Sequence, residues 1–287
     1  MREQGYTIAE LCEAFGLSPS GYHASRSRPP SPRELENRRI AKRVGELHGG
    51  GFTGSYGSPR ATRVLNSEGL RCSENRVARV MKNEGLKATT KRAFKPKTTV
   101  RDEGSPVAPN RLSSSPPPSV PGQQLAGDIT YVSTGEGWLY LSVAIDLFSR
   151  KVLGWSIGES MPASLVSSSL SKASRYPFIP GGLFHSDRGC QYTSSEVGRQ
   201  LDRLGLTPSM SAKGNCYDNS TCESFFATLK AEGFPPGGTF PTKAEARRTI
   251  FEYIETFYNT TRLHSSLGYL SPNRFLEAIK TQQKHLN

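Results

Sequence analysis

Long apolar runs are absent from this 287-residue sequence, and their absence limits where the protein can act. No apolar stretch approaches the ~18 residues that a membrane-spanning helix needs. The hydrophobic content is 35% and the mean hydropathy is -0.51, values that are typical of a soluble globular protein. Residues 1–10 carry charge and contain no apolar segment, so we expect neither a secretory signal nor membrane association.

Cysteine is also scarce, and its arrangement excludes two classes of small stabilised protein. The five cysteines are odd in number, scattered along the chain and never spaced as Cys-x-x-Cys. A disulfide framework and a four-ligand zinc site are therefore not expected. We interpret all five as reduced thiols in the cytosol: Cys12, Cys72, Cys190, Cys216 and Cys222.

Acidic residues are outnumbered, since 25 Asp and Glu stand against 37 Lys and Arg and leave a net charge of +12. The excess is uneven along the chain. Residues 1–122 contain 21 basic and 11 acidic residues, whereas residues 123–287 contain 16 and 14. A basic front half joined to a nearly neutral back half predicts a polyanion-binding arm on a catalytic body. Charge alone leaves an ordinary solvated basic surface open as the alternative.

Two segments of the basic front half have helix-turn-helix character. In residues 1–30, Thr7 and Glu10 have the spacing of a capping box, and Gly16 ends the short helix that follows. Residues 31–101 carry a stronger pattern, which we interpret as a basic helical DNA-binding domain of the helix-turn-helix type.

The stronger pattern consists of two helices separated by Gly69. Ser58 and Pro59 are typical of a helix start, and Ser73 caps the second helix, which Gly85 ends. The second helix has an apolar face and an Arg/Lys face, as expected of a recognition helix in a DNA groove. A small helical hairpin with a solvated face is the alternative. The candidate DNA contacts of this domain are Arg60, Arg63, Arg76, Arg79, Lys82, Lys91 and Arg92.

A composition change separates the front half from the rest of the chain. The Ser/Pro-rich run at residues 113–119 cannot form a packed core, so we place an extended linker at residues 102–122. In residues 123–287, alternating apolar residues predict an antiparallel meander, followed by alternating helices and strands and a helical tail. That order is typical of an α/β domain with a mixed sheet. The predicted strands of the meander are residues 125–132, 138–146 and 151–157.

Three carboxylates lie on different elements of this predicted sheet domain. Asp128 is within the first strand, Asp187 ends a later strand, and Glu223 begins a helix after 35 intervening residues. Carboxylates that converge on one sheet edge can bind two divalent ions, which stabilise the attacking and leaving oxygens of a phosphoryl displacement. Each acid also has an ordinary interpretation: a satisfied strand Asp, a turn cap, or a capping box formed with Ser220. The spacing by itself leaves these alternatives open.

Longer motifs add a resemblance that covers nearly the whole chain. His-Ser-Asp-Arg-Gly-Cys-Gln-Tyr surrounds Asp187, and Gly-Asn-Cys-Tyr-Asp-Asn leads into the helix of Glu223. Together with the other motifs, these segments resemble the OrfB product of the IS3 family of bacterial insertion sequences, an integrase-type transposase. The motifs occupy residues 56–60, 85–86, 138–150, 185–192, 214–230 and 258–272.

The resemblance implies a ribonuclease H-like catalytic domain that follows a small all-α helix-turn-helix domain. In this family the three acids of the D-D-35-E motif are catalytic and bind the metal, and they carry over to Asp128, Asp187 and Glu223. The implied cofactors are two Mg²⁺ or Mn²⁺ ions per active site. Lys230 lies two helical turns after Glu223 on the same face, where family members often have a basic residue that meets DNA phosphate.

The implied activity is metal-dependent strand cleavage at insertion-sequence ends and strand transfer into target DNA. Its implied partners are the terminal inverted repeats, target DNA, further copies of this chain, and an upstream-frame OrfA product as fusion or partner. Such a protein works in the bacterial cytoplasm, on the nucleoid. Two alternatives stay open: a nuclease of the same fold without strand transfer, and a non-catalytic DNA-binding regulator derived from an element.

Several other residues of the motifs have weaker claims to a functional role. We expect Asp146 to be structural, because it ends the second strand before a Ser-Arg turn. His185 alternates with Asp187 along its strand and lies either near the metals or in the core. We expect Arg262 and His264 to stabilise a turn near the C-terminus.

Overall fold

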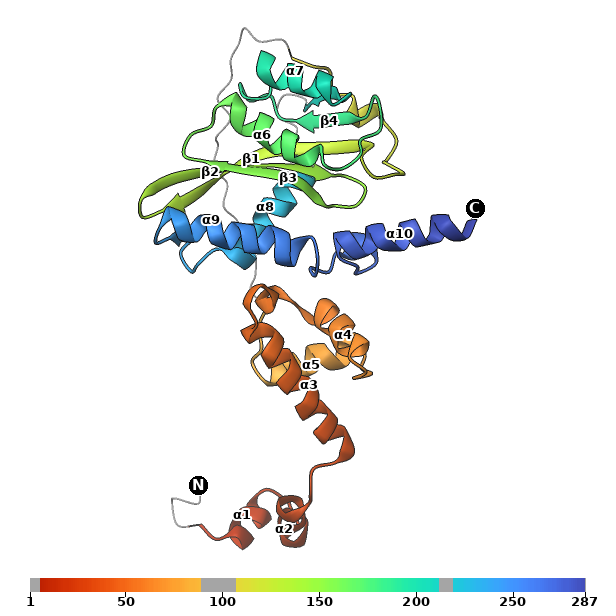
Figure 1. The fold of residues 1–287 in the computed structure, drawn as a ribbon. Helices are drawn as coiled ribbons and strands as arrows, with labels where there is room; N and C mark the ends of the chain where they lie inside the picture. The colour runs from red at the N-terminus through yellow and green to blue at the C-terminus, as the bar shows by residue number, and fades with distance from the viewer. Residues whose placement is uncertain (1–5, 89–106, 212–218, 287) are drawn as a thin grey trace.

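The computed structural model describes residues 6–88, 107–211 and 219–286, in which a helical N-terminal half precedes a larger α/β half (Figure 1). Within these residues, no helix combines the length and apolarity needed to cross a bilayer. The helices are α1 (Ile8–Ala14), α2 (Pro19–Ser27), α3 (Pro32–Gly49), α4 (Ser58–Ser67), α5 (Glu74–Asn83), α6 (Ala163–Ala173), α7 (Ser195–Arg203), α8 (Ser220–Gly233), α9 (Lys243–Phe251) and α10 (Pro272–Leu286).

The larger half is built on one six-stranded mixed sheet. Its strands are β1 (Gln124–Thr134), β2 (Gly137–Asp146), β3 (Val152–Gly158), β4 (Leu183–Ser186), β5 (Thr207–Met210) and β6 (Thr239–Phe240). The first three strands form an antiparallel meander, and β4 and β5 add in parallel beside β1, which gives the order β3-β2-β1-β4-β5. The predicted ribonuclease H-like mixed sheet is therefore confirmed.

Two hydrophobic clusters cover the two faces of the sheet. On one face lie α8, α9 and the π-helical segment η5 (Glu252–Tyr258), and on the other lie α6 and α7 (Figure 1). Along β1 the side chains alternate between the clusters: Ala126 and Val132 belong to the first, whereas Leu125 and Ile129 pack against the second. Even-numbered residues of β1 thus point toward α8.

α6 lies so close to the sheet that one position of β3 has no room for a side chain. A Cβ atom added at Gly154 would stand 2.1 Å from the backbone oxygen of Ser169 and 2.5 Å from the backbone nitrogen of Ala173. The absence of a side chain lets the helix backbone approach the strand directly.

α3, α4 and α5 form a helix-turn-helix-like domain with a core of its own. α5 follows Ser73, whose side chain accepts the N–H of Arg76, as the sequence predicts. α3 was not expected, because it buries only three apolar side chains along an otherwise charged helix. Those three residues are Ile40, Val44 and Leu47.

The helix starts follow the predicted caps, with two corrections. The capping box of Thr7 and Glu10 is present at α1, with both of its hydrogen bonds. α4, in contrast, is preceded by Gly57 and has no side-chain cap, so Ser58 is its first residue rather than its cap. The spacing of Thr193 and Glu196 predicts a capping box at α7, but the capping side chain there is that of Ser194, because its oxygen accepts the N–H of Val197.

The described part of the Ser/Pro-rich segment was predicted to be extended, but it contains a short 3-10 helix, η3 (Leu112–Ser114), and it is anchored to the sheet domain. The backbone N–H groups of Arg111 and Leu112 donate to Oγ of Ser209 on β5, at 3.0 and 3.1 Å. The side-chain amide of Gln124 donates to the backbone oxygen of Pro116 at 2.9 Å. Backbone groups that lack their own secondary structure thus find partners on the catalytic domain.

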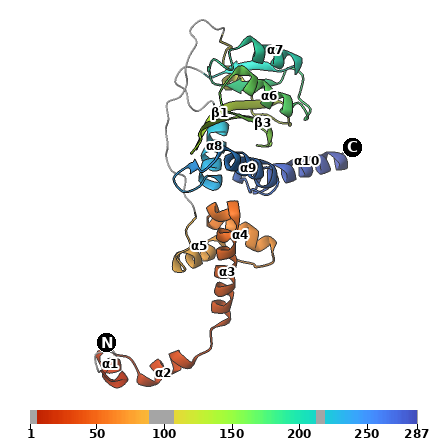
Figure 2. The same cartoon turned by 60° about the vertical axis from the view of Figure 1, so that its left-hand side comes forward.

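The helix-turn-helix-like domain docks on the α8 face of the sheet domain through η2 (Gly51–Ser55). The ring of Phe52 lies 5.1 Å from that of Tyr253 and 5.4 Å from that of Phe257. Tyr56 is 1% exposed and belongs to the core cluster of the sheet domain. The two domains therefore share buried aromatic side chains, whereas α1 and α2 lie at the far end of α3 (Figure 2).

Two glycines test the close approach of α6. Gly154→Ala should lower the free energy of unfolding by about 1–3 kcal/mol, because the new methyl group overpacks against a helix backbone. Gly198 of α7 has no atom within 4 Å of an added Cβ. Gly198→Ala should therefore raise the same quantity by roughly 0.5–1 kcal/mol, since alanine is the better helix former. Urea denaturation measures both, and an unchanged midpoint for Gly154→Ala would contradict the packing argument.

Candidate active site

Strand register places two acidic residues side by side near the middle of the sheet. Ala126 of β1 pairs in parallel with His185 of β4, and two residues further along each chain stand Asp128 and Asp187. Because side chains alternate along β1, Asp128 points to the face of Ala126, which α8 covers, and Asp187 directly follows the end of β4, close enough to Asp128 for its charge to raise the pKa of that acid. β1 has neighbours on both sides, so Asp128 does not lie on an edge strand.

Glu223 reaches the same face from the first turn of α8. Asn219, directly before the helix, donates from Nδ2 to the backbone oxygen of Gly127 at 3.4 Å, which ties the helix start to β1. α8 has no side-chain cap hydrogen bond, so the predicted alternative of a capping box with Ser220 is not found. Glu223 itself is exposed.

The three carboxylates are close enough to influence one another. The pKa of Asp128 is raised from 3.8 to about 8, first by burial and then by the charge of Asp187, with a smaller contribution from Glu223. The N–H of Ile129, which donates to Oδ1 at 2.8 Å, and the charge of Lys230 act in the opposite direction. Excess negative charge of this kind favours a bound cation.

The chemistry of the donors suits a hard divalent ion. Carboxylate oxygens are the ligands that Mg²⁺ and Mn²⁺ prefer. Among residues 6–88, 107–211 and 219–286, no three His, Cys, Asp or Glu side chains already stand together as a metal-binding group. The acids are thus coupled through charge rather than preassembled, and a metal ion would offset their mutual repulsion.

Asp187 also supports the turn that follows β4. Its Oδ1 accepts the backbone N–H of Gly189 at 3.0 Å. The turn-cap interpretation and the metal-binding interpretation are therefore compatible, because a carboxylate has two oxygens and about four lone pairs to offer.

Gly127 holds β4 in place beside the acids. A Cβ atom at this position would stand 2.3 Å from Cζ of Phe184, so the phenyl ring occupies the space that a side chain would need. Phe184 belongs to the cluster on the opposite face from Asp128. Its packing over Gly127 sets the position of β4, and with it the position of Asp187, relative to β1.

His185 lies in the core rather than open to the acids. It is 0% exposed, and its Nδ1 and Nε2 atoms lie 2.9 and 3.1 Å from the hydroxyl groups of Ser209 and Ser211. Ser209 Oγ already accepts two backbone N–H groups, so its own proton is directed to Nδ1. Nε2 then donates to Ser211, which links β4 to β5.

Asp146 has the structural role that the sequence indicates. Its Oδ1 accepts the backbone N–H of Gly122 at 3.0 Å, and its Oδ2 accepts that of Ser149 at 2.8 Å. The side chain is 1% exposed. It therefore closes the turn between β2 and β3 and does not join the three acids.

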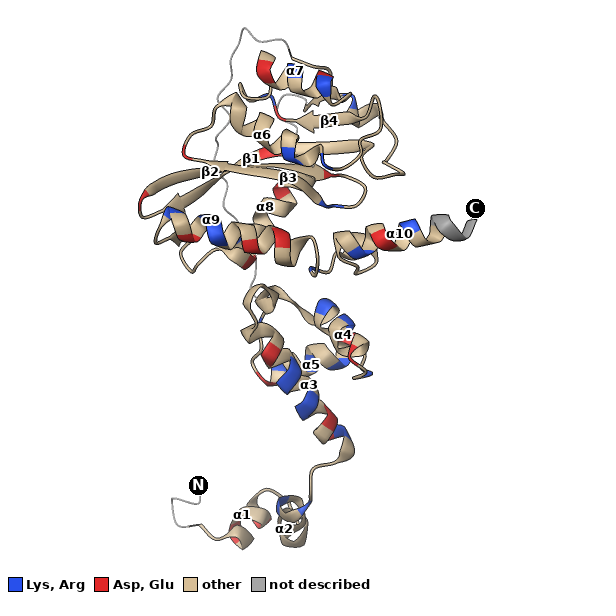
Figure 3. Ribbon diagram, in the orientation of Figure 1, with Lys and Arg blue, Asp and Glu red and all other residues tan. Residues whose placement is uncertain are grey.

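The predicted DNA contacts of the helix-turn-helix-like domain fall into three groups. Arg76 is held within the domain by an ion pair with Glu36 at 2.8 Å and a hydrogen bond to Asn37. Arg60 is half-buried and faces the sheet domain, where its Nε donates to the backbone oxygen of Leu263 at 2.9 Å. The exposed contacts, among the basic residues drawn in Figure 3, are Arg63, Arg79 and Lys82. Lys91 and Arg92 lie outside the described residues.

Lys230 lies below the acids, further along α8. Burial lowers the pKa of its ammonium group, and the negative charge of Asp128 raises it in part. The side chain is therefore close enough to Asp128 for the two charges to interact, which the sequence alone did not indicate.

Two buried side chains beside the acids escaped the sequence analysis. The pKa of Tyr192 is raised by burial and then by the charges of Asp128 and Asp187. The pKa of Cys222 is raised by burial and then by Asp128 and Glu223. Both read as ordinary core positions in the sequence, where no pattern signals that they lie close to the acids, Tyr192 in the cluster on the α6 and α7 face and Cys222 in the cluster on the α8 face.

Family comparisons agree with this division of the chain. Two models described as integrase core domain match residues 118–216 and 204–272. A model described as an HTH-like domain matches residues 34–94.

Several curated proteins are similar over almost the full chain. A transposase InsF for insertion sequence IS3A of Escherichia coli K12 is 39% identical over 94% of this chain and 94% of its own length. A transposase for insertion sequence element IS904 of Lactococcus lactis is 40% identical over 86% of this chain and 97% of its own. An uncharacterized 31 kDa protein of insertion element IS600 from Shigella sonnei is 39% identical over 93% of this chain and 97% of its own length.

Solved structures resemble the chain more distantly. The integrase catalytic core of HTLV-2, solved with magnesium as a trimer, covers 55% of this chain and 97% of its own, with 14% identity and a TM-score of 0.42. The match to a simian T-cell lymphotropic virus intasome in complex with a PP2A regulatory subunit covers 71% of this chain and 66% of the matched chain, with 16% identity and a TM-score of 0.43.

The raised pKa of Asp128 predicts that the metal-free protein loses stability as the pH rises. Between pH 3.8 and about 8, the folded protein holds a proton that the unfolded chain releases. The contribution of Asp128 is therefore most favourable at the acidic end and declines toward pH 8. Asp128→Asn removes this titration. In thermal melts with EDTA, the melting temperature of the variant should rise relative to that of wild type between about pH 5.5 and about pH 8.5. A constant difference between the two proteins would contradict the burial of this carboxyl.

Proposed function

The chain belongs to the IS3-family insertion-sequence transposases, which carry an integrase core domain, and on this premise we propose that it cuts element ends and joins them to target DNA. The reaction is a phosphoryl transfer between polynucleotides that needs no covalent protein intermediate. The observation that carries the proposal is the coupling of three carboxylates around Asp128, on the central strand of the integrase-type sheet.

We assign the metal ligands to Asp128, Asp187 and Glu223. Two bound Mg²⁺ or Mn²⁺ ions would activate the attacking water or DNA 3′-hydroxyl and stabilise the leaving oxygen. Asp128 suits the position that is shared by the two ions, because the charges of both Asp187 and Glu223 act on its carboxyl group. Asp187 and Glu223 would each complete one site, held respectively by the turn at Gly189 and by the contact of Asn219 with β1.

The helix-turn-helix-like domain would bind the terminal inverted repeats and orient them toward these acids. Arg63, Arg79 and Lys82 present exposed positive charge for this purpose. Because two element ends must be held together, we expect several copies of the chain to act on DNA, with an upstream-frame OrfA product as fusion or partner. Its DNA substrates place the protein in the bacterial cytoplasm, on the nucleoid.

A direct test is cleavage and joining of labelled element-end duplexes with Mg²⁺ or Mn²⁺. Wild type should give a metal-dependent joined product, and Glu223→Gln should reduce it by more than about 100-fold, because even outer partners of metal ligands are worth about 10–100-fold. Glu252→Gln is the matched control, since Glu252 is exposed on η5 and its carboxylate makes no hydrogen bond or ion pair within the described residues.

The products of this assay separate the alternatives. Hydrolysis without joining would identify a nuclease of the same fold. DNA binding with neither product, in this chain and in its fusion with the upstream frame, would identify a non-catalytic regulator. Joining that persists in Glu223→Gln would overturn the assignment of the third acid.

Arg79 and Lys82 give a separate prediction about DNA binding. Arg79→Gln/Lys82→Gln should weaken binding by a similar factor on all sequences and should reduce the slope of log affinity against log salt concentration by about 2. The control is Arg175→Gln/Arg248→Gln, which removes two exposed charges from the catalytic domain. Fluorescence anisotropy over a salt series measures both slopes, and equal slopes would contradict the assignment.

A further inference from the structure

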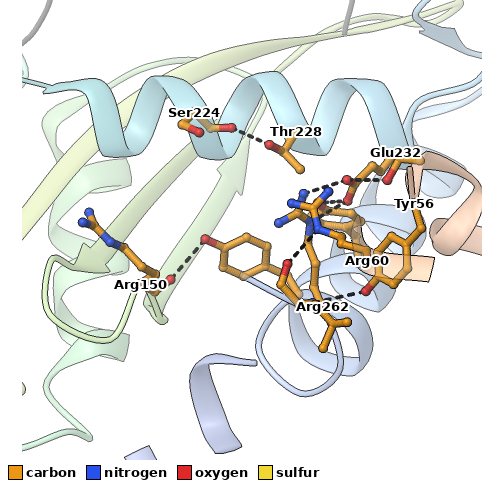
Figure 4. A network of polar contacts seen from close by, with 11 residues as sticks. Tyr56, Arg60, Arg150, Ser224, Thr228, Glu232 and Arg262 are labelled. Atoms are coloured by element: carbon orange, nitrogen blue, oxygen red, sulfur yellow. Dashed lines mark hydrogen bonds and ion pairs between the residues drawn. The ribbon is translucent and has the colours of Figure 1, made fainter. Parts of the chain in front are cut away.

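A polar cavity of about 310 Å³ lies where the helix-turn-helix-like domain meets the catalytic domain. Its walls come from α4, α8 and the segment before α10, which contribute Arg60, Ser224, Thr228, Glu232, Arg262 and His264. Figure 4 shows the polar network around it, in which the side chains of Arg60 and Arg262 approach each other below α8. The cavity lies outside the group of three acids and has no role in the proposed chemistry.

The one carboxylate of the cavity is fully engaged. Glu232 receives Nε and a terminal nitrogen of Arg262, both at 2.8 Å, and the hydroxyl groups of Tyr253 and Ser55, both at 2.7 Å. Burial raises the pKa of Glu232, but its hydrogen bonds and the charge of Arg262 lower the pKa by more, so that the net shift is downward. Glu232 and Arg262 thus neutralise each other, and no acceptor capacity of Glu232 is left for a second guanidinium.

Arg60 forms no ion pair within the described residues; its guanidinium carbon lies 5.5 Å from the centroid of the Tyr56 ring, and the charge of Glu232 favours its charged form only in part. Its Nε donates to the backbone oxygen of Leu263, and within the described residues its terminal nitrogens have no hydrogen-bond partner. Burial lowers the pKa of Arg60, and the nearby charge of Arg262 lowers it again. A half-buried cation beside a second cation is unfavourable by itself and becomes favourable when an anion lies against both.

His264 adds an unused hydrogen-bonding atom to the same cavity. Its Nε2 is buried and has no hydrogen-bond partner within the described residues. The pKa of His264 is lowered to about 3, first by burial and then by the charges of Arg262, Arg60 and Arg150. The ring is therefore neutral near pH 7, and in the tautomer that carries its proton on Nε2 this atom is a donor for an acceptor in a positively charged environment.

The cavity also lies on the route between the two proposed DNA sites. Ser224 is the residue after Glu223, and Thr228 follows one turn later on the same helix. The opposite wall is Arg60, in the first turn of α4 in the helix-turn-helix-like domain. The rim residues Ser265 and Ser266 are exposed, so a chain that enters from solvent can reach the inner walls.

We propose that this cavity binds a backbone phosphate of the element-end DNA, between the helix-turn-helix-like domain and the catalytic acids. The ligand class follows from the walls: a guanidinium, an imidazole N–H and hydroxyl groups recognise a phosphodiester oxygen. No Phe, Tyr or Trp is among the residues that line the described walls, so a base finds no large aromatic surface on which to stack. The proposal rests on the proposed function, but it concerns positioning of DNA and not the chemical step.

The test is a methylphosphonate scan, in which each phosphate of an element-end duplex is replaced in turn by a neutral group. Binding is measured by anisotropy in EDTA, so that metal binding and catalysis do not contribute. For wild type, replacement at one or two adjacent phosphates should weaken binding by about tenfold, the value of a charged hydrogen bond. Arg60→Gln should weaken binding to the unmodified duplex. Replacement of those same phosphates should then no longer change the affinity of this variant.

Two further variants guard against a folding effect. Ser266→Asp adds a negative charge at the exposed rim without removing a buried group, and it should lose the response at the same phosphates. Arg248→Gln, which removes an exposed charge of α9, should retain the full scan profile. Thermal melts establish that each variant remains folded.

The outcomes separate this inference from the proposed function. An identical scan profile in wild type, Arg60→Gln and Ser266→Asp would overturn the phosphate site, even if cleavage and joining are observed. A rise in melting temperature with inorganic phosphate in wild type alone, together with identical profiles, would identify a free-anion site and overturn the DNA assignment. Loss of the response in both variants would support the site even where no joined product forms.

Discussion

The pairing of β1 on both of its sides determines how the catalytic domain is assembled. β2 pairs with β1 in antiparallel register from Leu125 to Thr134, and β4 adds in parallel on the other side. A shift of β1 by one residue would turn Asp128 away from α8, because side chains alternate along a strand. The packing of Phe184 over Gly127 holds the parallel pair in place, so the positions of the acids depend on a core contact on the opposite face.

This arrangement places like charges close together, and the surrounding structure keeps them there. Without a cation, burial and the neighbouring acids make the charged form of Asp128 unfavourable, and its pKa is raised for that reason. α8 then connects the site with the N-terminal domain, since Glu223 lies in its first turn and Glu232 near its end, where Ser55 of η2 is bound. One rigid helix thus links the acids to the DNA-binding domain that we propose, and the phosphate site lies along it.

Local signals in the sequence predicted much of the fold. The capping box at Thr7, the glycine after α5 and the alternation along β1 and β2 each act within a few residues, so they are visible without tertiary information. The weak apolar stripe of α3 was missed, because three buried residues in a charged helix carry little periodic signal. The anchoring of residues 107–123 was missed as well, since it depends on the hydroxyl of Ser209 on β5, which is distant in sequence, and on the side-chain amide of Gln124 on β1, which donates to Pro116.

The sequence by itself determined the family and named Asp128, Asp187 and Glu223 as candidates, because motif order and spacing are properties of the chain. Only the tertiary structure showed the local setting of these acids. Asp128 is not on an edge strand, and Glu223 is not in a capping box. It also moved Arg60 from a predicted helix face to a cavity beside Arg262 and His264. These outcomes depend on contacts between residues up to 203 positions apart, such as Arg60 with Leu263, which no local pattern contains.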